Sequence, residues 1–144
     1  MTRRLSVTVV SLLMTTGCGG QARRPDEAPK SVVAWRTIGS WSGRGNKQTE
    51  SFRSDTGALR IRWTTSSQSN GDRGGDGAFR VAAHSAISGR LLEQAVDHRG
   101  TGSGVDYVNQ DPHVFYLLIE SDGLNWTFSV EEAVAATVTG ERSR

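Results

Sequence analysis

Short runs in which apolar and polar residues alternate fill most of the chain after residue 31. In 57–65 (GALRIRWTT), the side chains of Leu59, Ile61 and Trp63 fall on one side and the arginines on the other. The same period of two recurs in 124–131 (LNWTFSVE). This is the period of a β-strand that buries one face and exposes the other to water. The pattern therefore predicts an all-β domain.

Extended along the chain, the alternation predicts about eight strands. They lie at 32–41, 48–54, 57–65, 77–86, 90–98, 103–109, 113–121 and 124–131. Asp122-Gly123 predicts a two-residue hairpin between the last two strands, because glycine accepts the positive φ of a type I′ turn. Asp55-Thr56-Gly57 predicts a second turn. Short strands separated by turns at this spacing favour an antiparallel β-sandwich.

One predicted strand, 113–121 (HVFYLLIES), is apolar on both faces. Phe115, Leu117 and Ile119 suit the core, but Val114, Tyr116 and Leu118 on the other face are apolar as well. One interpretation is a central strand whose outer face is partly covered by its neighbours or by residues 133–140 (AVAATVTG), a segment for which extension of the last strand is the alternative. The other is an exposed face that docks a partner protein through Val114, Tyr116 and Leu118.

The first 17 residues have the anatomy of a secretory signal. Arg3 and Arg4 precede an apolar stretch at 5–14, which is shorter than the roughly 20 residues needed to span a bilayer. Small residues then lead to Cys18, the single cysteine of the chain, so no intrachain disulfide is expected. Residues 19–31 contain two of the three prolines and almost no large apolar side chain, which is typical of a flexible linker.

The segment TTGC at 15–18 resembles the lipobox of bacterial lipoprotein precursors, although Thr15 stands where that family usually has leucine. The resemblance implies cleavage before Cys18 and acylation of its thiol, with several acyl chains giving firm membrane attachment. It also implies a place in the cell envelope, and Gly19 in place of aspartate favours the outer membrane if the source has two. The expected organisation is a signal peptide at 1–17, a lipidated tether at 18–31, a sandwich at 32–132 and a C-terminal extension at 133–144.

Charge adds one exclusion. The chain has 17 basic and 15 acidic residues, and two of the basic residues lie in the predicted signal. The mature chain would therefore be formally neutral, with no long basic run, so we expect no nucleic-acid partner.

Candidate chemistry is sparse. His84, His98 and His113 are not at metal-ligand spacing, and no G-x-S-x-G motif is present, so we expect no metal centre, no cofactor and no enzymatic activity. The remaining candidates are a sugar-stacking Trp41 with Asn46, and a Ca²⁺-binding loop at 70–77. The loop would supply Asp72 and Asp76 as oxygen ligands. The alternatives are packing of Trp41 at the core or its rim, and a mobile hairpin loop without a ligand.

The strands GALRIRW, GAFRVAAHS and FYLLIESDGLNWTFSV are similar in rhythm to bacterial pre-peptidase C-terminal and CUB-like modules. That resemblance implies a jelly-roll or CUB-like sandwich with an accessory role in binding and no site residues of its own. The sequence thus leaves three functions open. They are a lipid-anchored domain that contacts an envelope protein or glycan, a carbohydrate- or calcium-dependent binding module, and an enzyme with a dispersed site.

Overall fold

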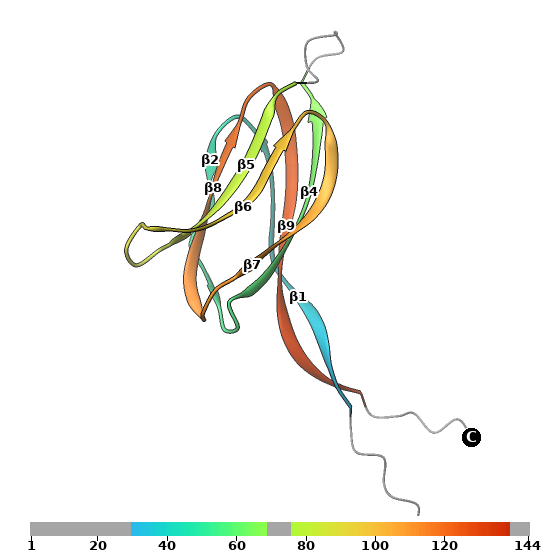
Figure 1. The fold of residues 1–144 in the computed structure, drawn as a ribbon, viewed down its shortest axis with the longest axis vertical. Helices are drawn as coiled ribbons and strands as arrows, with labels where there is room; N and C mark the ends of the chain where they lie inside the picture. The colour runs from blue at the N-terminus through green and yellow to red at the C-terminus, as the bar shows by residue number, and fades with distance from the viewer. Residues whose placement is uncertain (1–29, 69–75, 139–144) are drawn as a thin grey trace, which may run out of the picture.

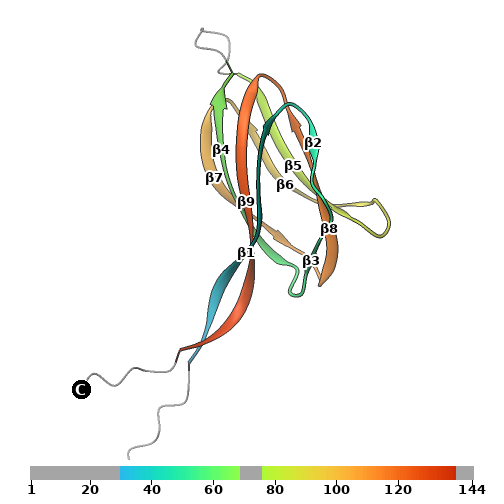
Figure 2. The ribbon, with the colours of Figure 1, turned by 180° about the vertical axis from the view of Figure 1, so that it is seen from behind.

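The computed structural model describes residues 30–68 and 76–138, and these form an all-β fold (Figures 1 and 2). The strands are β1 (Lys30–Arg44), β2 (Lys47–Gln48), β3 (Phe52–Ser54), β4 (Ala58–Ser67), β5 (Ala78–Ser85), β6 (Leu91–Arg99), β7 (Gly102–Asn109), β8 (His113–Ser121) and β9 (Leu124–Val138). None of these residues forms a helix that could cross a membrane. The predicted strand at 48–54 is the pair β2 and β3, interrupted at residues 49–51.

Two antiparallel sheets pack face to face. Sheet 1 has the order β1-β9-β4-β7, and sheet 2 has the order β2-β8-β5-β6 with β3 also paired to β8. The pairings are nested, since β1 pairs with β9, β2 and β3 with β8, β4 with β7, and β5 with β6. A long hairpin rolled up on itself gives this nesting, which is the jelly-roll arrangement. The predicted antiparallel sandwich is confirmed.

The predicted hairpin at Asp122-Gly123 is wrong. The chain does reverse there, but β8 belongs to sheet 2 and β9 to sheet 1, so the turn crosses between sheets. Gly123 has φ of 67°, whereas no residue other than glycine has a positive φ in the described chain, so a type I′ turn is excluded. Among the nine described strands, β5 and β6 are the only two that follow each other in the sequence and also pair with each other in a sheet.

The longest strands, β1 and β9, pair from Lys30↔Val138 to Arg44↔Asn125. Because β4 pairs with β9 only as far as Leu59↔Glu132, residues 30–35 and 133–138 form a two-stranded ribbon. The ribbon projects from the sandwich, and both described ends of the chain lie at its tip (Figures 1 and 2). Residues 133–138 therefore extend the last strand, one of the two alternatives for this segment, and do not cover the outer face of β8, because they continue β9 in the other sheet.

The core lies between the sheets and is built from the inward positions of the alternating strands. Trp63 and Trp126 are buried, as predicted, and Phe79 packs between them, 5.7 Å from the first ring and 6.4 Å from the second. Phe115, Leu117 and Ile119 of β8 are fully buried. Burial of an apolar side chain of this size stabilises the fold by about 1.5–3 kcal/mol.

Gly57 ends the turn between β3 and β4 under two constraints. Its φ is 71°, and a Cβ at this position would lie 1.9 Å from the carbonyl oxygen of Gln110. Gly123 has a similar φ of 67°, but a Cβ there would meet nothing within 4 Å. A side chain at either position would strain the backbone, but only a side chain at position 57 would also overlap with other atoms.

We predict that Gly57→Ala destabilises the fold by more than about 3 kcal/mol, because the backbone of residues 110–111 must move. Gly123→Ala should cost about 1 kcal/mol, the price of a positive φ alone. Urea unfolding followed by tryptophan fluorescence measures both variants. Equal losses would contradict the steric account.

Candidate functional site

The outer face of sheet 1 carries hydroxyl groups across all four of its strands. Ser42 lies opposite Thr127, Thr127 opposite Thr64, and Thr64 opposite Ser103, so one row crosses the sheet. The next row holds Ser40, Ser129, Arg62 and Val105. We call this surface the hydroxyl face: Ser40, Ser42, Arg62, Thr64, Ser103, Thr127 and Ser129. Neighbouring strands lie about 4.8 Å apart, so the hydroxyls form a regular array.

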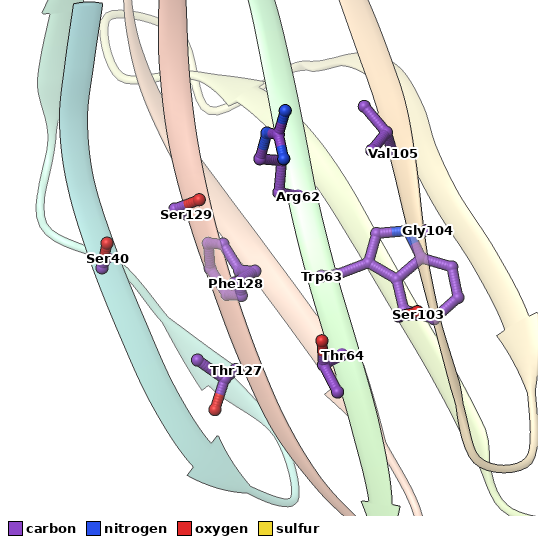
Figure 3. A pocket seen from close by; sticks show the side chains of 10 residues that line it. All are labelled: Ser40, Arg62, Trp63, Thr64, Ser103, Gly104, Val105, Thr127, Phe128 and Ser129. Atoms are coloured by element: carbon purple, nitrogen blue, oxygen red, sulfur yellow. The ribbon is translucent and has the colours of Figure 1, made fainter.

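A shallow depression of about 410 Å³ lies on this face. Figure 3 shows its lining, with side chains that project from β1, β9, β4 and β7. Most of the outward side chains, among them Ser40, Arg62 and Thr127, are exposed to solvent. The depression is therefore open, its lining mixes hydroxyl groups and one guanidinium with apolar surface, and a ligand would lie across the strands.

One end of the hydroxyl face is aromatic and charged. The guanidinium of Arg60 lies 4.2 Å from the ring centroid of Trp35, whose ring is 6.1 Å from that of Tyr107. Glu131 accepts hydrogen bonds from Arg60 Nε at 2.6 Å and from Arg62 Nε at 3.2 Å. The hydrogen bond from Arg60, followed by the charges of both arginines, lowers the pKa of Glu131 although burial opposes this. One carboxylate thus faces two guanidinium groups, so this cluster of three side chains carries a net positive charge.

Trp41 does not stand out from the surface. Its ring stacks on Phe128 at 5.3 Å and lies 6.1 Å from Phe52, and its Nε1 donates a hydrogen bond to Glu50 at 3.0 Å. The indole is half-buried against the core. This placement agrees with packing at the rim of the core, and sugar stacking on Trp41 stays a prediction.

The other predicted ligand residues do not join Trp41. The Oδ1 atom of Asn46 accepts a hydrogen bond from the backbone N–H of Ser121 at 3.0 Å, so it fixes the end of β8. Asp76 is exposed, and Asp72 lies outside the described residues. Within residues 30–68 and 76–138, no group of three or more His, Cys, Asp or Glu side chains is placed to hold a metal ion.

The apolar outer face of β8 lies on sheet 2. Val114, Tyr116 and Leu118 are half-buried there, and the ring of Tyr116 stacks on His84 of β5 at 5.2 Å. A depression of about 140 Å³ beside Leu118 reaches Leu91 of β6. The three residues thus share one face, as predicted, and docking of a partner protein through them stays a prediction.

A serine and a histidine that the sequence did not connect lie together in sheet 2. Ser85 Oγ and His113 Nε2 are 2.7 Å apart, 28 positions apart in sequence. The same oxygen accepts hydrogen bonds from the backbone N–H groups of Ile87 and Ser88, and Ser85 is only 2% exposed. The hydroxyl therefore fixes the β5–β6 turn and is out of reach of a substrate.

Glu132 is a buried carboxylate that sequence analysis missed. It is fully buried, and its Oε1 accepts hydrogen bonds from Ser54 Oγ at 2.7 Å and from the backbone N–H groups of Asp55 at 2.6 Å and Thr56 at 2.9 Å. Arg36 donates to Oε2. A signal for it did exist, since the inward alternation of β9 continues from the apolar positions directly to residue 132.

Burial raises the pKa of Glu132, but the hydrogen bonds from Ser54, Arg36, Thr56 and Asp55 outweigh it and lower the pKa to about 2. A carboxylate held ionised in this way is a poor proton donor or acceptor near neutral pH. We therefore assign Glu132 to the stability of the fold, where it ties the turn at 54–57 to β9.

No protein-family model matches this chain, and a comparison with curated proteins gives no match.

We predict that Glu132→Gln destabilises the fold by about 3 kcal/mol at pH 7, since it leaves Arg36 and the turn N–H groups without their anion. Because the folded-state pKa of about 2 lies below the ordinary 4.5, the stabilisation is present above about pH 4.5 and lost as pH falls toward 2. Urea unfolding between pH 2 and 7 measures this. Glu120→Gln, at an exposed carboxylate, is the control and should keep the wild-type pH profile. A variant of Glu132 that loses stability in parallel with wild type on acidification would contradict the assignment.

Proposed function

We propose that this protein is a non-enzymatic binding domain of the bacterial cell envelope, anchored by lipid on Cys18 and displayed outside the membrane. Two features support this proposal. One is the signal-like segment with the TTGC motif at 1–18, and the other is the architecture of the domain. The observation that carries it is the β1/β9 ribbon, because its tip is where residue 30 begins the described chain (Figure 1).

This arrangement suits a display module. Cys18 precedes Lys30 by only twelve residues, so an anchored chain would enter the domain through the ribbon. The outer faces of both sheets lie away from that entry and carry no helix in the described residues. A tethered domain with two open faces can contact envelope components without leaving its membrane.

The same features favour binding over catalysis. The hydroxyl of Ser85, which is paired with His113, is buried and holds a turn, and the buried carboxylate of Glu132 is saturated with hydrogen bonds. The hydroxyl face, in contrast, offers hydrogen-bond donors and acceptors from four strands over a surface that solvent reaches. It is the surface to which we assign binding.

We predict that Cys18→Ser abolishes the incorporation of labelled palmitate into the chain, because the hydroxyl of serine does not accept the lipid. Metabolic labelling followed by immunoprecipitation measures the bound lipid, and globomycin treatment should cause the unprocessed wild-type precursor to accumulate. Labelling of the variant at the wild-type level would refute the anchor.

The binding role has its own test. The Cys18→Ser chain should sediment with isolated cell envelopes and should be displaced by an excess of unlabelled chain. A parallel sample with a calcium chelator tests the calcium-dependent alternative, which predicts loss of sedimentation. Failure to sediment in both samples, with and without the chelator, would overturn the binding role.

A further inference from the structure

If the proposed binding function holds, the side chains of the hydroxyl face indicate the chemical class of the ligand. The row formed by Ser42, Thr127, Thr64 and Ser103 presents groups that both donate and accept hydrogen bonds. A polyhydroxylated ligand matches such a row, because each of its hydroxyls is also both donor and acceptor. An apolar ligand would leave the row without hydrogen-bond partners, at a cost in free energy.

Arg62 adds a charge requirement. It lies in the depression, its side chain is 54% exposed, and its contact with Glu131 uses Nε. A guanidinium has five N–H donors in a planar fork, so the four others remain for a planar anion such as a carboxylate. Because Arg60 shares the same Glu131, the carboxylate does not neutralise both cations.

The aromatic end of the face fits the same ligand. Tyr107 is 50% exposed and lies next to Trp35, so its ring can pack against the C–H groups of a sugar ring. A protein partner is less well matched, since the centre of this face lacks the buried aromatic and apolar anchors of protein interfaces. Two arginines against one glutamate are also too few for the phosphate backbone of a nucleic acid.

We propose that the hydroxyl face binds an acidic glycan, with Arg62 pairing with a sugar carboxylate and the Ser/Thr row hydrogen-bonding to the sugar hydroxyls. The strand order makes this possible, since β1, β9, β4 and β7 each contribute residues that are distant in sequence (Figure 3). The depression is lined by residues of all four strands, so a ligand of more than one sugar would contact several strands together.

The test uses the full chain, purified from the cell fraction that holds it, and three soluble polymers. Polygalacturonate carries hydroxyls and carboxylates, dextran carries hydroxyls alone, and polyglutamate carries carboxylates alone. Isothermal titration or affinity electrophoresis should show binding to polygalacturonate at least tenfold tighter than to either of the others.

Matched variants locate the site. Arg62→Ala should weaken polygalacturonate binding at least tenfold, and Arg62→Lys should recover only part of the loss because an ammonium lacks the planar fork. Arg80→Ala is the control, because Arg80 on sheet 2 is 43% exposed and makes a similar Nε contact with Asp97 at 3.1 Å. Thr64→Val keeps the shape of the side chain and removes its hydroxyl, and it should also weaken binding.

The outcomes are distinct. Equal binding to polyglutamate or to dextran would overturn the proposal, as would equal losses from Arg62→Ala and Arg80→Ala. Absence of binding to all three polymers would overturn it too. If the chain still sediments with cell envelopes in that case, the glycan assignment fails and the proposed binding function stands. If it binds neither, both fail.

Discussion

The end of the sandwich where the ribbon begins depends on the hydrogen bonds that the carboxylate of Glu132 accepts. A jelly roll joins its two sheets by turns that cross between them, and such turns have no ladder to hold them. Glu132 replaces the ladder at one crossing, because a single buried anion gathers the side chain of Ser54 and two backbone N–H groups of the β3–β4 turn. Arg36 supplies the opposite charge from β1, so the same carboxylate ties together two sheets and the base of the ribbon.

That architecture gives the domain two outer faces of different chemistry. Sheet 1 presents the hydroxyl face with Arg62, whereas sheet 2 presents Val114, Tyr116 and Leu118 beside the ring of His84. Both faces are consequences of strand alternation, since each inward apolar position forces its neighbours outward. The proposed acidic-glycan site occupies the first face, and docking of a protein on the second stays a prediction.

The candidate site was the part that the sequence could least predict. Ser42, Thr64, Ser103 and Thr127 come from four strands, and no local motif links them. A tryptophan ring can stack on a sugar, yet the position of Trp41 on β1 is inward, opposite Phe128, and the ring packs on the core. Residue type and neighbours in sequence indicate a chemical capacity, whereas the sheet order decides which capacities meet.

The alternation of apolar and polar residues by itself determined the strands, their buried faces and the all-β class, because a period of two is a local property of the backbone. It also placed Trp63, Trp126 and Phe115 in the core. Only the tertiary structure decided which strands pair. Asp122-Gly123 specifies a reversal of the chain, but the partners of β8 and β9 lie in different sheets, because pairing depends on burial across the whole sandwich. Long-range packing likewise turned residues 133–138 into the second strand of the ribbon and brought Glu132 to the turn at 54–57.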